Sequence, residues 1–163
     1  MLCPRSFRQP HRTGRTGLTV ELPFKRLNDV AALPQAQYPG DAGLDLRSTV
    51  AVSVAPGERV MIPTGVAVAI PAGHAGLVLP RSGLASTHGL TLANAPGLID
   101  AGYRGEVICA VVNLDPSTSV EIGVGDRIAQ LVIIAVPSVA PAWVDDLPGS
   151  VRGEGGFGST GST

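Results

Sequence analysis

Short apolar segments between closely spaced turns constrain the fold of this chain more than any other feature of its sequence. Apolar residues alternate or run together in 50–54, 60–70, 77–79, 107–112 and 128–136. Turn signals separate them at Pro39-Gly40, Pro56-Gly57, Pro63-Thr64-Gly65, Pro71-Ala72-Gly73, Pro96-Gly97, Asp115-Pro116 and Gly123–Gly125. No window of ten or more residues has a clean helical period. The pattern predicts an all-β fold, a jelly roll or distorted β-barrel of short strands.

One short helix is expected near 82–88. The segment 77–79 has the composition of a strand that ends at Pro80, and Arg81 to His88 follows it without a turn signal. Ser82 is a candidate N-cap, because its hydroxyl could accept a hydrogen bond from a free N–H of the first turn.

The 163 residues suit a single domain with two flanking segments. Residues 1–17 carry Arg among Pro, Gly and Thr, so we expect a disordered basic extension, with a targeting or nucleic-acid role as the alternative. Residues 18–136 form the expected β-barrel domain. Residues 137–163 form a Pro- and Gly-rich C-terminal arm, which has no core of its own and is either disordered or ordered by docking.

Bulk properties exclude several function classes. The net charge of −1 does not favour a nucleic-acid polymer as partner, and no apolar run approaches the roughly 18 residues of a membrane span. Cys3 and Cys109 provide no disulfide framework, and the three histidines lie far apart, so no structural metal is predicted. A soluble cytoplasmic protein is expected.

Two segments could bind a metal or an anion. Asp41 and Asp45 flank Gly43, and in a strand both carboxylates would share a face and could look toward one cation. The alternative is a turn in which Asp41 is the hydrogen-bonding residue. Pro80-Arg81-Ser82-Gly83 could bind an anion at the start of the helix, or could be an ordinary helix cap.

Thr91 to Arg104 is predicted to form a hairpin of two short strands around Ala95-Pro96-Gly97. It carries an amide (Asn94), a carboxylate (Asp100) and a ring (Tyr103), which could bind a base edge, hold a water and pack on a sugar. Alternatively these are a turn residue, a solvated acid and a core tyrosine.

Two later segments add polar groups in unusual settings. Arg127 and Gln130 interrupt an apolar strand, and a buried glutamine needs either a protein partner or a ligand. The segment Arg152–Gly161 places Arg152, Phe157, Ser159 and Thr160 on a glycine-rich chain, which could wrap phosphates and stack on a base, or could be a flexible tail.

In this order the segments resemble the trimeric dUTPase family over residues 18–161. DAGLDLRS, PRSGLA, the N-x-PGLIDAGYRGE segment, GDRIAQL and RGEGGFGSTG look like the five motifs of that family in sequence and spacing. The basic extension before Leu18 is outside the family pattern, and Ala93 and Ala95 stand where small polar residues are also common.

The resemblance implies hydrolysis of dUTP to dUMP and pyrophosphate, which keeps uracil out of DNA and supplies dUMP for thymidylate synthesis. It implies a homotrimer whose active sites are shared between subunits, with Asp100 activating the attacking water and Asp45 holding Mg²⁺ through water. The implied substrate-binding residues are Arg81, Ser82, Gly83 and Gln130 for phosphates, Asn94, Leu98, Ile99, Asp100 and Ile108 for uracil, Tyr103 for the sugar, and Arg152, Phe157, Gly158, Ser159 and Thr160 in the closing arm.

Two alternatives remain at this stage. A dCTP deaminase shares the fold and the central segments but differs in its C-terminal pattern. A nucleotide-gated protein-binding module would use closure of the arm to signal that a nucleotide is bound.

Overall fold

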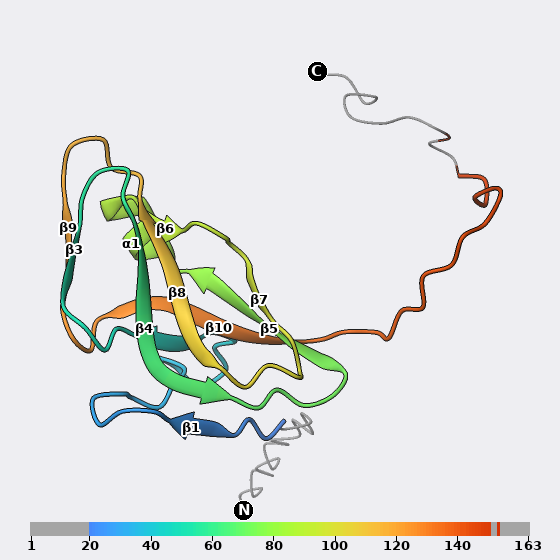
Figure 1. The fold of residues 1–163 in the computed structure, drawn as a ribbon, viewed down its shortest axis with the longest axis horizontal. Helices are drawn as coiled ribbons and strands as arrows, with labels where there is room; N and C mark the ends of the chain where they lie inside the picture. Colours follow the sequence, from blue (N-terminus) through green and yellow to red (C-terminus); the bar gives the residue numbers. More distant parts are fainter. Residues whose placement is uncertain (1–19, 151–152, 154–163) are drawn as a thin grey trace, which may run out of the picture.

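A computed structural model of the chain describes residues 20–150 and Gly153, and within them it contains ten β-strands and one α-helix (Figure 1). The strands are β1 (Phe24–Arg26), β2 (Leu44–Arg47), β3 (Val52–Val54), β4 (Arg59–Val68), β5 (His74–Pro80), β6 (Leu90–Leu92), β7 (Gly97–Ile99), β8 (Glu106–Asn113), β9 (Val120–Ile122) and β10 (Arg127–Ala135). The helix is α1 (Ser82–His88). The all-β prediction with one short helix is confirmed.

The strands form two four-stranded antiparallel sheets and a separate two-stranded ribbon. One sheet has the order β1-β4-β8-β6, the other has the order β2-β10-β5-β7, and β3 pairs with β9. A single apolar core draws on both sheets, with Ile62 and Val111 from the first and Leu46 and Leu131 from the second. This is the layered arrangement that a jelly roll requires.

Alternation of side chains explains why the predicted segments become strands. In β8 every second residue is buried, beginning with Val107, so the strand covers one side of the core while its other side faces outward. The predicted ranges 50–54, 60–70, 77–79, 107–112 and 128–136 correspond to β3, β4, β5, β8 and β10. The Pro63-Thr64-Gly65 signal does not end β4 but shifts its register against β8 between Pro63 and Ala67.

The helix begins as predicted, but the predicted cap is wrong. Arg81 occupies the N-cap position in an extended conformation, no side chain caps the helix, and Ser82 is already its first helical residue. The helix ends at Gly89, whose φ of 66° is left-handed. A Cβ at Gly89 would lie 2.7 Å from the backbone N of Asp115, so glycine is required for both reasons.

The predicted hairpin between 91 and 104 is also wrong. The two short strands exist as β6 and β7, but β6 pairs with β8 and β7 pairs with β5, so they belong to different sheets. Residues 93–96 therefore cross from one sheet to the other. Each short strand gains more by pairing with a long, buried strand than it would by pairing with its equally short neighbour.

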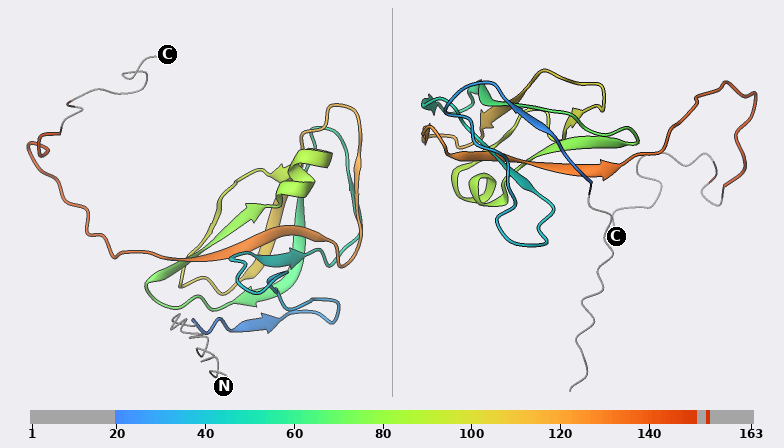
Figure 2. Two further views of the ribbon diagram at one scale, coloured as in Figure 1. Left: turned by 180° about the vertical axis from the view of Figure 1, so that it is seen from behind. Right: turned by 90° about the horizontal axis from the view of Figure 1, so that it is seen from below.

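After β10 the chain leaves the body of the molecule. Residues 136–150 extend away from both sheets in all three views (Figures 1 and 2). The Trp143 side chain is fully exposed there, as is most of Val139. In the part of the chain that the structure describes, no helix has the length and apolar character needed to cross a membrane.

Candidate functional site

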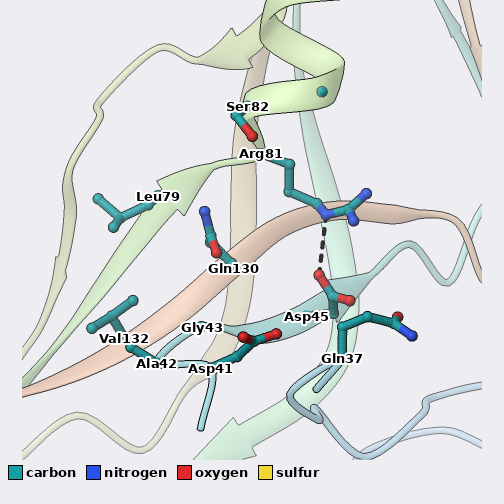
Figure 3. A pocket seen from close by; sticks show the side chains of 11 residues that line it. Gln37, Asp41, Ala42, Gly43, Asp45, Leu79, Arg81, Ser82, Gln130 and Val132 are labelled. Atoms are coloured by element: carbon teal, nitrogen blue, oxygen red, sulfur yellow. Dashed lines mark ion pairs between the residues drawn. The ribbon is translucent and has the colours of Figure 1, made fainter. Parts of the chain in front are cut away.

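A polar cavity of about 430 Å³ lies where β2, β5 and β10 meet the start of α1 (Figure 3). Four predicted phosphate-binding residues line it, together with both carboxylates of the first motif. These are Arg81, Ser82, Gly83 and Gln130, with Asp41 and Asp45. Arg81 lies at the junction of β5 and α1, Ser82 and Gly83 begin α1, and Gln130 lies on β10. The structure thus brings together residues from three separate motifs.

Asp41 reaches this cavity from a turn and not from a strand. Strand β2 begins at Leu44, and the Asp41 carboxylate accepts a hydrogen bond from the Tyr38 N–H (3.0 Å). The expectation that Asp41 and Asp45 share a strand face is therefore wrong, and the turn alternative is correct. Both carboxylates nevertheless face one cavity, because the chain bends between them (Figure 3).

Asp45 lies between two guanidinium groups. Its Oδ1 is 3.0 Å from Nε of Arg81, and its Oδ2 is 3.2 Å from Nη1 of Arg127. Arg127 also donates to the side chain of Gln37. The two guanidinium groups offset the negative charge of Asp45, and among the described residues only the Asp41 carboxylate of this cavity has no cation paired with it.

Arg127 and Gln37 are functional-site candidates that the sequence did not identify. The sequence marked Arg127 only as a polar residue in an apolar strand. Between Arg127 and Ala129 the pairing of β10 with β2 shifts register. Strict alternation from Gln130 would turn Arg127 away from Asp45, and the irregularity re-aims it. Such a shift has no short-range sequence signal.

Gln130 lines the cavity in which the sequence placed it, and its amide nitrogen has a protein partner. It lies opposite Asp45 in the β10–β2 register, and its Nε2 donates to the Pro80 carbonyl (3.0 Å). Its amide oxygen lies directly over Gly43, where a Cβ would overlap with it. The amide is thus held at the cavity wall by a carbonyl on one side and a glycine on the other.

A second, less polar cavity of about 190 Å³ lies between β7 and the start of β8. Five predicted uracil- or sugar-binding residues line it, namely Asn94, Leu98, Ile99, Tyr103 and Ile108. Strand β7 is the last strand of its sheet, so one edge carries backbone N–H and C=O groups that no strand pairs. A flat ring with donors and acceptors on its edge could pair with this strand.

Tyr103 forms one wall of this cavity. Its hydroxyl donates to the Glu106 carbonyl oxygen (2.9 Å), and its backbone N–H donates to the Asp100 carbonyl (3.0 Å) in a tight turn. Asp100 follows directly after β7, and its side chain is exposed beside the cavity without lining it. Asp100 is thus adjacent to the base-sized cavity and open to water.

The two cavities lie on opposite sides of strand β5. Val78 lines the smaller cavity and Leu79 lines the larger one. Because successive residues of a strand point to opposite faces, the sheet itself separates the two cavities within one chain. Val78 and Leu79 thus contact the two cavities from opposite faces of β5.

Five predicted site residues, Arg152, Phe157, Gly158, Ser159 and Thr160, lie outside the described residues. Their roles remain predictions.

Two perturbed pKa values belong to structural groups. Burial in the core raises the pKa of the Cys109 thiol to about 12, so it stays protonated and is no nucleophile at neutral pH. Hydrogen bonds from the backbone N–H groups of Ser117 and Thr118 lower the pKa of Asp115, which organises an exposed turn. Neither residue lines the two cavities.

Comparison with known proteins agrees with this arrangement. The dUTPase family model matches residues 29–161. The deoxyuridine 5'-triphosphate nucleotidohydrolase of Streptomyces coelicolor is 56% identical to the chain, over 90% of this chain and 79% of its own length.

Two solved structures are similar throughout the fold. A Staphylococcus bacteriophage 80alpha dUTPase with dUPNHPP has a TM-score of 0.80 and 33% identity, covering 88% of this chain and 100% of that chain. A mutant dUTPase from phage phi11 of S. aureus, described with the coordination of a structural Mg(II) ion, has a TM-score of 0.74 and 28% identity, covering 80% and 100%. From its motifs, its fold and these relatives, the chain belongs to the dUTPase family.

Proposed function

We propose that this protein hydrolyses dUTP to dUMP and pyrophosphate. The observation that carries the proposal is the sorting of the motif residues into two cavities of different chemistry. One is sized for a base with a carboxylate beside it, and the other is lined by a guanidinium, a hydroxyl, amides and two carboxylates. The reaction removes dUTP from the nucleotide pool and yields dUMP. Because that pool is soluble, we also propose that the enzyme acts in the cytoplasm.

Uracil would be recognised at the unpaired edge of β7. The backbone of Leu98–Asp100, the backbone at Ile108 and the Asn94 amide offer donors and acceptors to the base edge. Cytosine exchanges donor and acceptor at N3 and at the C4 substituent and would leave buried groups unpaired, which is a large penalty. A methyl group at C5 would be excluded by contact alone. Tyr103 would pack on the deoxyribose and leave no room for a 2′-hydroxyl.

Asp100 would serve as the general base. Its carboxylate takes a proton from water, the water oxygen bonds to the α-phosphorus, and the bond from that phosphorus to the bridging oxygen breaks. Pyrophosphate leaves with the bridging oxygen. The exposed position of Asp100 beside the base cavity supports this role, because an attacking water has access to it.

Arg81, Ser82, Gly83 and Gln130 would bind the triphosphate, since their cavity offers a guanidinium, a hydroxyl, an amide and an open backbone. Arg152, Gly158, Ser159 and Thr160 would close over the phosphates, and Phe157 would stack on the base. Closure would exclude water and strengthen the charge interactions inside.

The residues present fit a magnesium ion that arrives with the triphosphate. The described residues hold no group of three or more metal-ligating His, Cys, Asp or Glu side chains, and Asp45 already has two arginine partners. Mg²⁺ keeps several waters and commonly binds through one or two carboxylates plus substrate phosphates. Asp45 would hold it through water, and when bound the ion neutralises phosphate charge and orients the chain of phosphates.

The site would be shared between subunits of a homotrimer. The placement of the two cavities supports this, because they contact opposite faces of β5 through Val78 and Leu79, so a nucleotide that uses both kinds of cavity would draw them from two chains. The segment 137–150 supports it as well, because it extends away from both sheets and could reach another chain.

Product analysis with dUTP, dCTP, dTTP and UTP, with and without Mg²⁺, tests the proposal. We expect magnesium-dependent release of pyrophosphate from dUTP and little from the other three. Release of ammonia from dCTP without pyrophosphate from dUTP would instead identify a deaminase.

Replacement of Asp100 by Asn tests the general base. We expect turnover to fall by a factor on the order of 10² to 10⁴, because the amide cannot accept the proton from water. Affinity for a non-hydrolysable dUTP analogue, measured by titration calorimetry, should remain close to wild type. Undiminished turnover in this variant would remove Asp100 from the mechanism.

A further inference from the structure

The ring of Tyr103 lies directly against the backbone of Gly105. A Cβ built on Gly105 would lie 2.6 Å from the Tyr103 Oη, 2.8 Å from Cζ and 3.3 Å from Cε2. Carbon atoms do not approach a ring this closely, so any side chain at position 105 would displace the ring. The glycine provides the space that the ring occupies.

Backbone conformation does not explain this glycine. The φ of Gly105 is not among the positive φ values of the chain, so alanine could adopt the same backbone without strain. The close approach of the ring is the remaining constraint. A substitution here acts on Tyr103, not on the path of the chain.

The other side of the ring is fixed by the same short segment. The Tyr103 hydroxyl donates to the Glu106 carbonyl, and the Glu106 side chain in turn accepts from the Gly65 N–H of β4 (2.7 Å). Glu106 is therefore tied to the body of the sheet. The Glu106 carbonyl, which accepts the hydrogen bond from the Tyr103 hydroxyl, is fixed on β8, and Gly105 lies against the ring. These two contacts hold the ring at the wall of the base cavity.

We infer that Gly105 is a positioning residue for Tyr103 and thereby sets the discrimination between deoxyribose and ribose. The inference rests on the proposed function, in which the Tyr103 ring leaves no room for a 2′-hydroxyl. A methyl group at position 105 displaces the ring, breaks its bond to Glu106 and moves that wall of the cavity. The deoxyribose loses its contact, and the ribose loses the steric penalty.

The test compares Gly105→Ala with Gly102→Ala in the full-length chain. Gly102 lies in the same loop, also lacks a positive φ, and a Cβ there would meet nothing within 4 Å. The measurement is kcat/KM for dUTP and for UTP. We expect the dUTP-to-UTP ratio to fall roughly 10-fold or more in Gly105→Ala and to stay at the wild-type value in Gly102→Ala. An unchanged ratio in a folded Gly105→Ala protein overturns the inference.

A second comparison uses the background that lacks the ring. In Tyr103→Ala, adding Gly105→Ala should not lower the ratio further, because the two changes act through one contact. Additive effects would place the action of Gly105 elsewhere and overturn the inference. If the clash with Tyr103 prevents Gly105→Ala alone from folding, the double variant of Tyr103→Ala and Gly105→Ala should fold, because it lacks the ring. If the double variant also fails to fold, the clash with Tyr103 is not the cause, and the inference is overturned.

Failure of the underlying function is measured separately. Absence of pyrophosphate release from dUTP by the wild-type chain refutes the proposed function itself. If the wild-type enzyme prefers dUTP to UTP and the Gly105→Ala variant has the same preference, only the role of Gly105 is refuted.

Discussion

At the scale of single residues, the two cavities hold their polar side chains in place with glycines. The Gln130 amide lies over Gly43, and the Asn94 amide nitrogen would be 3.3 Å from a Cβ at Gly97. Neither glycine has a positive φ. They serve as close-approach positions, which fix the direction of a flexible amide without burying it completely.

Replacement of Gly43 by Ala should weaken triphosphate binding while leaving the fold intact. The new Cβ overlaps with the far end of Gln130, which can move away at little cost to folding but then loses its bond to the Pro80 carbonyl. The displaced amide would then no longer be placed to bind the triphosphate. Loss of one hydrogen bond to a charged phosphate corresponds to roughly a 10-fold or greater loss of affinity. Calorimetric titration with a non-hydrolysable dUTP analogue measures this loss.

The control for Gly43→Ala is the same substitution in the Gln130→Ala background. There the alanine has no amide to displace, so no further loss of affinity is expected. Wild-type affinity in the single variant would show that the orientation of Gln130 does not matter for the triphosphate.

The sequence predicted the identities of most cavity-lining residues but not how they are held. Arg81, Gln130 and Tyr103 were identified because motif patterns retain residue type and order. The role of Arg127 depends on a register shift, and that of Gly105 on a ring lying against a backbone. The first depends on pairing between strands far apart in the chain, and the second depends on the direction that a side chain takes within one short loop; residue spacing encodes neither.

At the scale of elements, most strands were predictable, although β1 and β9 were not identified, and their partners were not predictable. Period-two alternation marks a strand wherever one face is buried, as in β8. The pairing of β6 with β8 and of β7 with β5 depends on contacts between segments far apart in the chain, so the predicted hairpin was wrong. The same crossing leaves one edge of β7 free, and the proposed uracil site uses that edge.

The outward side of β4 and β8 is largely apolar between the charged residues Arg59 and Glu106 at its ends. Met61 is 64% exposed and Ile108 is 45% exposed, and their directly opposed neighbours on that side are Ala110 and Pro63. A sheet that is apolar on both sides is expected to be covered on both. In the proposed homotrimer, other copies of the chain would cover this side.

Replacement of Met61 by Asp should therefore dissociate the assembly and abolish turnover. A carboxylate on an apolar interface is costly to bury, whereas in a separate chain it stays solvated. Sedimentation velocity measures the assembled mass, and circular dichroism checks that the sheets persist. Val124→Asp is the matched control, because Val124 is an exposed apolar residue in the turn after β9. An unchanged mass for Met61→Asp would exclude this side of the sheet as the interface.

At the scale of the whole molecule, the proposed homotrimer would combine parts of a site that different chains supply. The cavity for the base and the cavity for the phosphates lie on opposite sides of β5, and the chain beyond β10 extends away from both. The apolar side chains of Trp143 and Val139 remain exposed to solvent in the single chain. The sequence alone could not indicate this separation, because it depends on which face of β5 each cavity occupies.

Removal of residues 152–163 should leave the assembly folded but lower turnover by roughly 100-fold or more, because the missing residues contribute ligand contacts and not core. Removal of 161–163 alone, which retains Thr160, should have little effect. Loss of the assembled mass in the longer truncation would contradict this prediction.

The same truncated chain provides a sharper test when it is refolded in equal amounts with the Asp100→Asn chain. If Asp100 and the closing arm of one site come from different chains, sites that pair an intact Asp100 with an intact arm form in the mixture, and about a quarter of the wild-type rate should return. If both come from one chain, every site lacks one of them and the mixture stays as inactive as its components.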